Sequence, residues 1–273
     1  MQNIDQGAEN YLEVNRESWN NCTPVHLSSD FYGVEEFIAG KTSLNPIELE
    51  LLGDITGKKI LHLQCHFGQD SISLARLGAE VTGVDFSDAA IHAARELAGK
   101  CNVKCRFVES DVYALPGHLE DEFDMIFTSY GVIGWLPDLH KWAGVIKHFL
   151  KPGGKLLLVE FHPVMWIFDE HFDRVTYNYF NAGPILEESS GTYTDRDAPI
   201  HYRTISWNHS LSEIFRVLEG NGMRLKYFQE YDYSPYNCFK DLIERRPREF
   251  VLEKYPGMLP MVFSLVAENK IPF

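Results

Sequence analysis

Residues 58–87 read KKILHLQCHFGQDSISLARLGAEVTGVDFS, and this stretch decides the fold class. The apolar run KKILHLQ predicts a buried strand. Leu74 and Leu77 lie on one face of an amphipathic helix predicted over residues 70–77, which Gly78 ends. AEVTGVD predicts a second buried strand. Buried strands joined by a helix are typical of a parallel sheet with both faces covered.

The same alternation continues to residue 161. A helix is predicted from the N-cap Ser87 to Gly99, and another, of period 3.6, at LPDLHKWAGVIKHFLK. Further strands are predicted at KCRFVESD, FDMIFTSY and GKLLLVEF. After an irregular segment come a helix, SLSEIFRVLEGNG, and two strands, MRLKYFQEYDY and MVFSLVAENK. We therefore expect an α/β fold with a seven-stranded, mostly parallel sheet and helices on both faces.

We expect one domain over residues 1–273, made of four parts. Residues 1–45 precede the first strand and contain the helical segment YLEVNRESW, and residues 46–162 hold the alternating core. Residues 163–210 break the alternation, are rich in aromatic residues, and hold at most a short hairpin in TYTDRDAPIHYRTISW. A segment this long without regular structure is usually a lid, although its aromatics could equally form a small satellite core. Residues 211–273 complete the sheet.

The turn after the first strand indicates the ligand class. Dinucleotide sites carry G-x-G-x-x-G at such a turn. The corresponding positions 64, 66 and 69 are Gln64, His66 and Gln69, so a nicotinamide cofactor is disfavoured. Only Gly68 provides the freedom that lets a backbone approach a ligand closely.

The order of motifs resembles the class I S-adenosylmethionine-dependent methyltransferases, from about residue 58 to 161. VTGVDFS, FVESDVYALP, FDMIFTSYGVIGWLPD and LKPGGKLLLVE follow one another as that family's motifs do. The string from LHLQCHFGQD to VTGVDFS is similar to a subgroup of uncharacterised bacterial members in which glutamine and histidine replace the first glycines. The resemblance implies a Rossmann-like fold, S-adenosylmethionine as the cofactor and an N-terminal helical cap.

The resemblance also implies roles for individual residues. Asp85 would hold the ribose hydroxyls with Phe86 beside it, or it could merely cap the next helix. Asp111 and Val112 would recognise adenine, although Asp111 could instead be a solvated turn acid. The family often closes its cofactor pocket with an N-terminal helix, so Trp19 is a candidate contact.

Gln64 and His66 stand where the family has glycines. Each side chain either contacts the methionine part of the cofactor or only packs the turn, and the sequence leaves both readings open. An imidazole could donate a hydrogen bond to the methionine carboxylate, which would make His66 a ligand.

Candidates for catalysis lie at the carboxyl ends of the strands, where open parallel sheets bind ligands. His162 is a candidate base because imidazole titrates near neutrality, with a strand-capping histidine as the alternative. Tyr130 follows the fourth strand and is either a catalytic residue or a wall of the cofactor pocket. Methyl transfer is an in-line displacement, so alignment of the acceptor and exclusion of water matter most.

Composition limits the partners. Lysine and arginine number 25 against 39 acids, a net charge of −14, which disfavours nucleic acids and acidic membranes and leaves a small molecule as the expected acceptor. The five cysteines show neither a zinc spacing nor a disulfide framework, and no apolar run is long enough to span a membrane. We expect a cytoplasmic, bacterial enzyme without a metal, either a monomer or a homodimer. The rival functions are a cofactor-binding protein without transferase activity and, less favoured, a dinucleotide-dependent oxidoreductase.

Overall fold

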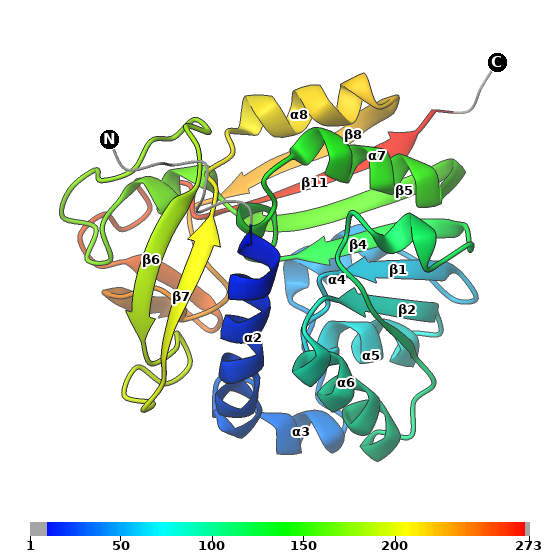
Figure 1. The fold of residues 1–273 in the computed structure, drawn as a ribbon, viewed down its shortest axis with the longest axis horizontal. Helices are drawn as coiled ribbons and strands as arrows, with labels where there is room; N and C mark the ends of the chain where they lie inside the picture. Colours follow the sequence, from blue (N-terminus) through cyan, green and yellow to red (C-terminus); the bar gives the residue numbers. More distant parts are fainter. Residues whose placement is uncertain (1–9, 271–273) are drawn as a thin grey trace.

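Seven strands form one sheet in the order β3-β2-β1-β4-β5-β11-β8 in this computed structural model, which describes residues 10–270 (Figure 1). β11 is antiparallel to both β5 and β8, and the other strands run parallel to one another. The predicted seven-stranded, mostly parallel sheet is confirmed. Its strands are β1 Lys59–Leu63, β2 Glu80–Asp85, β3 Arg106–Glu109, β4 Phe123–Ser129, β5 Leu150–Phe161, β8 Met223–Tyr231 and β11 Val262–Asn269.

Helices cover both faces of this sheet, as predicted. One face carries α4 (Pro46–Leu52), α5 (Gln69–Arg76) and α6 (Asp88–Lys100), and the other carries α7 (Leu139–Phe149) and α8 (Leu211–Gly220). The Ser87 hydroxyl caps α6 by accepting a 3.0 Å hydrogen bond from the Ala90 amide, as its sequence position predicts.

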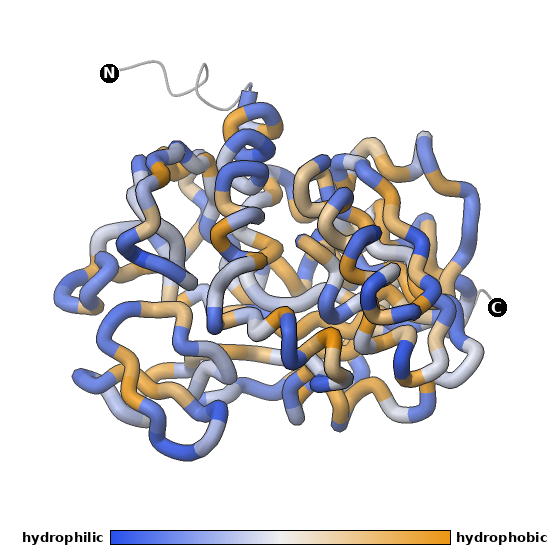
Figure 2. Tube along the Cα trace, turned by 90° about the horizontal axis from the view of Figure 1, so that it is seen from below, coloured by the Kyte–Doolittle hydropathy of each residue, from blue (hydrophilic) through white to orange (hydrophobic). Residues whose placement is uncertain are grey.

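The core beneath α7 shows why the periodic pattern matters. Trp142 and Phe149 are completely buried on one face of this helix, in one cluster with Leu156 and Leu158 of β5. Truncating either aromatic ring to alanine would cost about 3–5 kcal/mol. Hydrophobic stretches accordingly gather inside the fold, and hydrophilic ones occupy the outer loops (Figure 2).

The N-terminal helix α2 (Tyr11–Ser28) is longer than the predicted segment 11–19 and continues through Pro24. It lies between the sheet domain and the hairpin described below (Figure 1). The buried Asn15 amide donates to the Ile205 carbonyl at 2.8 Å and accepts from its N–H at 2.9 Å. A short helix, α3 (Val34–Ile38), follows. Residues 1–9 of the predicted cap, like the last three residues of the chain, lie outside the described residues.

Residues 163–210 contain more regular structure than predicted. A 3-10 turn, η3 (Pro163–Ile167), follows β5, and two antiparallel strands, β6 (Ile185–Ser190) and β7 (His201–Ser206), form a separate sheet. The prediction that any hairpin lay within residues 192–207 was wrong, because that stretch holds only the turn and the second strand. Short 3-10 turns also occur at η1 (Leu115–Gly117) and η2 (Ile133–Trp135).

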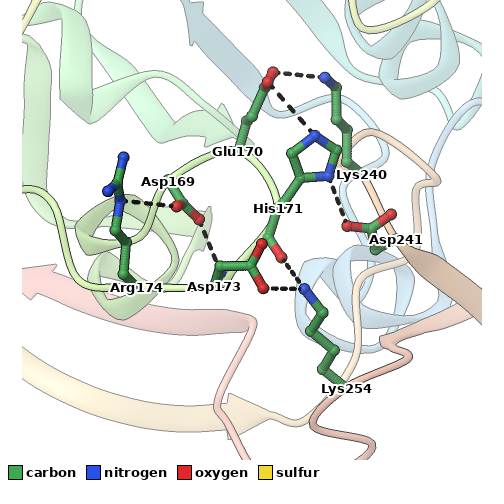
Figure 3. A network of polar contacts seen from close by, with 8 residues as sticks. All are labelled: Asp169, Glu170, His171, Asp173, Arg174, Lys240, Asp241 and Lys254. Carbon is green, nitrogen blue, oxygen red and sulfur yellow. Dashed lines mark hydrogen bonds and ion pairs between the residues drawn. The ribbon is translucent and has the colours of Figure 1, made fainter.

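A second insertion, missed in the sequence, lies between β8 and β11. Residues 232–261 contain the antiparallel pair β9 (Leu242–Arg246) and β10 (Glu249–Leu252). Polar contacts join it to the first insertion (Figure 3). His171 lies 3.0 Å from Asp241, and Lys240 lies 2.6 Å from Glu170. The two insertions therefore form one connected structure beside the sheet.

No helix among the described residues is long and apolar enough to cross a membrane. All five cysteines are free thiols.

Candidate active site

A cavity of about 1190 Å³ opens at the carboxyl ends of β1, β2, β4 and β5. Its walls come from α2, from both insertions and from the turns that follow these strands. Pockets for one small ligand usually have about 300–1,000 Å³. This cavity therefore has room for a cofactor and an acceptor together.

The turn after β1 forms one end of the cavity and has an unusual backbone. Gln64 and His66 have φ values of 54° and 49°, and Gly68 has φ of 78°. This left-handed region suits glycine, and each non-glycine residue there costs of order 1–3 kcal/mol. A Cβ on Gly68 would also lie 2.7 Å from the Phe107 ring. The turn thus keeps a conformation that glycines would favour, although two of its residues are not glycines.

The side chains of Gln64 and His66 both line the cavity and also have protein partners. The Gln64 amide donates to the Val132 carbonyl at 2.9 Å, while its own oxygen is buried without a partner. His66 Nε2 lies 2.9 Å from His26 Nδ1. Packing and ligand contact are therefore compatible at both positions.

His26 of α2 was not predicted as a site residue. It is 1% exposed, lines the cavity, and has a buried Nε2 without a partner. Burial lowers the pKa of His26 to about 4 and holds the pKa of His66 well below its usual value, so both imidazoles are neutral at pH 7. Trp19, which was predicted, also lines the cavity, 5.3 Å from the His66 ring and 5.6 Å from that of Trp135.

Asp85 lies at the end of β2 and lines the cavity with Phe86. One carboxylate oxygen accepts from the His66 N–H at 2.8 Å and the other from the Ser87 N–H at 2.9 Å. Burial raises the pKa of Asp85 to about 6, against the opposing effect of these hydrogen bonds. Each oxygen retains a lone pair, so the carboxylate can accept further hydrogen bonds from a ligand.

Asp111 and Val112 do not line this cavity. Val112 is buried in the core cluster beneath α7. Asp111 accepts a 3.1 Å hydrogen bond from the Ala114 N–H, and burial raises its pKa. Ser110, which precedes Asp111, nevertheless donates its N–H to the Asp85 carbonyl at 2.9 Å, so Asp111 lies next to the end of β2 and its adenine role stays a prediction.

His162 also lies outside the cavity walls. Its Nδ1 accepts from the Val164 N–H at 3.1 Å, and its Nε2 lies 3.0 Å from Glu230. Burial lowers the pKa of His162, while Glu230 opposes that shift. This placement fits the alternative, a histidine that caps the strand end, while both of its chain neighbours, Phe161 and Pro163, line the cavity, so the role of His162 as a base stays a prediction.

Tyr130, the other predicted catalytic residue, lines the cavity at the end of β4 with φ of 34°. Nearby Glu160 accepts hydrogen bonds from the N–H groups of Gly131, Val132 at 2.7 Å and Ile133 at 3.0 Å, besides Phe161 at 2.6 Å. Glu160 is thus engaged in holding the turn that carries Tyr130.

Glu48 of α4 was not predicted either. It is completely buried, one of its oxygens has no partner, and the Asn45 amide donates to the other oxygen at 3.1 Å. The pKa of Glu48 is raised to about 7. Burial is the larger cause, and the nearby charge of Asp70 is the second. A sequence signal existed, because Leu44, Glu48 and Leu52 recur every four residues and place an acid on an apolar face.

The sequence is similar to those of known methyltransferases. Residues 60–154 match a family model described as a methyltransferase domain. An uncharacterized methyltransferase of Synechocystis is 34% identical over 134 residues, which are 48% of this chain and 60% of the relative. The ubiquinone biosynthesis O-methyltransferase of Pasteurella multocida is 29% identical over 166 residues, 56% of this chain and 64% of the relative. The chain thus spans less than two thirds of the length of either relative.

An S-adenosylmethionine-dependent methyltransferase from Mesorhizobium loti has a similar solved structure, with a TM-score of 0.57 and 19% identity. The match covers 85% of this chain and 99% of that one, and at this identity it shows a shared fold. Residues 60–154 are therefore a methyltransferase domain, and the chain has the fold of the S-adenosylmethionine-dependent methyltransferases.

Proposed function

We propose that this protein transfers a methyl group from S-adenosylmethionine to a small-molecule acceptor. The observation that carries the proposal is one continuous cavity of about 1190 Å³, lined both by Asp85 at the end of β2 and by Tyr130, which follows β4. Its volume exceeds the usual range for one ligand. The name of the Pasteurella relative, a ubiquinone biosynthesis O-methyltransferase, also supports a small-molecule acceptor.

The residues at the Asp85 end suit the cofactor. Asp85 would accept hydrogen bonds from the ribose hydroxyls, and Gly68 would admit the ligand close to the backbone. Gln64, whose amide oxygen has no partner, and His66 both line the cavity and would contact the methionine part of the cofactor. When bound, the cofactor supplies a methyl group that is already activated by a sulfonium, so the chain mainly has to position the acceptor and exclude water.

We propose that the N-terminal segment 1–45 and the insertion 163–210 act as cap and lid over this cavity. Within the described residues, α2 is held from both sides. Asn20 donates to Asp88 of α6 at 2.7 Å, whereas Asn15 pairs with Ile205 of β7. Cap and lid would therefore close together. Residues 46–162 would bind the cofactor, and residues 211–273 would complete the sheet and add the second insertion.

We also propose where the protein acts and with what it associates. The free thiols and the bacterial relatives support a bacterial cytoplasmic protein. The net charge of −14 disfavours nucleic acid as a partner. Size-exclusion chromatography with light scattering would decide between monomer and homodimer.

The test is release of S-adenosylhomocysteine from S-adenosylmethionine across a library of phenols, alcohols, amines, thiols and carbon acids. Acceptor-dependent release is expected from the wild type and not from Asp85→Ala. Cofactor binding without release across the library would favour the rival, a binding protein without transferase activity. Binding of NAD in place of S-adenosylmethionine would favour the oxidoreductase.

A further inference from the structure

Two arginines without an acidic partner line the cavity. Arg196 belongs to the first insertion and Arg248 to the second, and both residues are exposed. Within residues 10–270, neither guanidinium group takes part in an ion pair, although the chain has 39 acids against 25 basic residues. Both side chains are therefore available to an anionic ligand.

The hairpin that carries Arg248 also carries two arginines of a different kind. Arg245 forms two hydrogen bonds with Asp232, at 2.7 and 3.0 Å, and Arg246 lies 3.8 Å from Glu249. Neither Arg245 nor Arg246 lines the cavity, whereas Arg248 does. Pairing with a surface acid thus explains the first two arginines and does not explain the third.

The backbone at Arg248 is strained. This arginine follows Pro247 as the second residue of the two-residue turn between β9 and β10, and its φ is 62°. Glycine or asparagine is favoured at such a position, because other side chains are crowded there. An arginine in this conformation on a cavity wall is an indication of function.

Backbone contacts place Arg248 on the side of the cavity left to the acceptor. Phe250, two residues after Arg248, exchanges two backbone hydrogen bonds with Ser234, at 2.8 and 2.9 Å. Tyr236, two residues after Ser234, packs edge-on against Tyr130, with ring centroids 5.0 Å apart. Tyr130 follows β4, which β1 separates from β2 and from the proposed ribose site. The hairpin therefore lies toward the acceptor.

A tight loop brings Arg196 to the same region. Gly191 opens this loop with φ of 68°, and a Cβ there would collide with the Arg196 backbone. Tyr193 of the loop and Tyr236 of the second insertion contact the same ring, that of Phe31, with centroids 5.4 and 5.7 Å away. The two insertions thus meet at Phe31, and each brings one unpaired arginine.

The second insertion makes this part of the wall basic and aromatic. Among the described residues, it contributes Lys240 and Arg248 to the wall but no acid. Its Phe239 contacts Phe161 and Trp166, with ring centroids 5.0 and 5.4 Å away, and all three rings line the cavity. Trp166 is 41% exposed, so part of its ring is available for stacking on a ligand.

Four acids of the first insertion also line the cavity, and three of them have partners. Asp169 lies 3.3 Å from Arg174, and the Tyr177 hydroxyl donates to Glu187 at 2.7 Å. The third acid takes up Lys240, at 2.6 Å. Among the described residues, the cations of the wall that keep no acidic partner are the two arginines.

We propose that Arg196 and Arg248 bind an anionic group of the acceptor, a carboxylate or a phosphate, and that an aromatic ring of the acceptor stacks on the wall formed by Phe161, Trp166 and Phe239. The inference rests on the proposed function and names its substrate class, an aromatic acid. A guanidinium group suits this role because its planar fork donates two parallel hydrogen bonds to a carboxylate or a phosphate. The two insertions then select the acceptor, and the sheet domain holds the cofactor.

The test compares the binding of benzoate with that of benzamide, which has the same ring and no charge. Calorimetric titrations use the wild type, Arg196→Gln, Arg248→Gln and, as the matched control, Arg246→Gln, each with and without S-adenosylhomocysteine. We expect the wild type and the control to bind the acid about tenfold more tightly than the amide, or better. In both site variants the ratio should fall to about threefold or less, while the Kd for S-adenosylmethionine stays within about twofold.

Phenyl phosphate distinguishes the two anions, because tighter binding than that of benzoate assigns a phosphate and weaker binding a carboxylate. A ratio near one in the wild type, a ratio that persists in both site variants, or no binding of any probe at millimolar concentration would overturn the anion site. Failure of the proposed function would show separately, as absent binding of S-adenosylmethionine, since the probes are also titrated without a cofactor.

A second measurement separates ligand binding from a role in the turn. Arg248→Gly removes the side chain and suits the φ of 62°. We expect the Tm of this variant to equal or exceed that of the wild type, and its preference for benzoate over benzamide to be lost. A lower Tm with the preference intact would show that Arg248 only shapes the turn, and would overturn its role in binding.

Discussion

Replacing the buried Glu48 by glutamine should stabilise the protein, and only above about pH 5. In the folded protein the pKa of Glu48 is about 7, whereas the ordinary value is 4.5. The folded state therefore holds this proton more tightly than the unfolded chain does. Below pH 4.5 Glu48 is protonated in both states and the free energy of unfolding keeps its full value. As the pH rises to about 7, this free energy falls progressively.

The size of the effect follows from the two pKa values. At about 1.4 kcal/mol for each pH unit between them, ionised Glu48 lowers the free energy of unfolding by up to about 3 kcal/mol at pH 8. Glu48→Gln removes the charge and keeps an oxygen for the Asn45 amide. The variant should therefore match the wild type at pH 4.5 and exceed it at pH 8, where its Tm would be roughly 6 °C higher or more.

Urea unfolding at several pH values between 4.5 and 8.5 measures this difference, with Glu50→Gln as the matched control. The control changes an exposed acid on α4 and should follow the wild type throughout. A gain for Glu48→Gln of the same size at every pH would mean that Glu48 does not titrate in this range. A loss of stability at pH 8 would mean that the carboxylate has a stabilising partner in solution. Either result would refute the reasoning.

Four further predictions concern the cofactor and the lid. Asp85→Ala should weaken S-adenosylmethionine by roughly 2–4 kcal/mol, or about 30- to 900-fold in Kd by calorimetry, because two hydrogen bonds to a charged group are lost; an unchanged Kd would leave Asp85 as a residue that only holds the turn. The pKa of Asp85 in the ligand-free protein is about 6, and ribose hydroxyls favour its ionised form. The affinity of the wild type for S-adenosylmethionine should therefore rise from pH 5 to pH 7 and then level off, and Asp85→Asn should abolish this pH dependence. His66→Gly should change the affinity for S-adenosylmethionine, whereas a packing role alone would alter Tm in thermal denaturation and leave affinity intact. Replacing residues 166–206 by a Gly/Ser linker should abolish transfer and also weaken the cofactor, because Asn15 of α2 loses its partner Ile205; a shortened protein that still methylates would show that the insertion is no lid, and one that does not fold would show that its aromatics are core.

Most of the sheet could be predicted because β1, β2, β4, β5 and β11 are largely buried. Burial on both faces leaves an apolar run such as KKILHLQ, and the alternation with helices then implies parallel pairing. The small sheets outside it escaped prediction for the opposite reason. β9 reads LIERR and is mostly exposed, so its composition does not distinguish it from a loop.

The site could be predicted only in part. Gly68, Asp85 and Tyr130 follow strand ends, where topology alone brings them to one cavity. His26 and Glu48 come from helices that precede the first strand; the spacing of Leu44, Glu48 and Leu52 predicts a buried acid, but nothing local predicts that either helix lies beside this cavity. The role of His162 stays a prediction, because spacing along the chain does not reveal its partner, which is Glu230 of β8 in the fold.

Calorimetric titration of the purified protein with S-adenosylmethionine tests the central claim most directly. We expect saturable binding of one molecule per chain, a response to S-adenosylhomocysteine at the same site, and no response to NAD. Absence of any heat or thermal stabilisation at millimolar S-adenosylmethionine, in an otherwise folded protein, would contradict it.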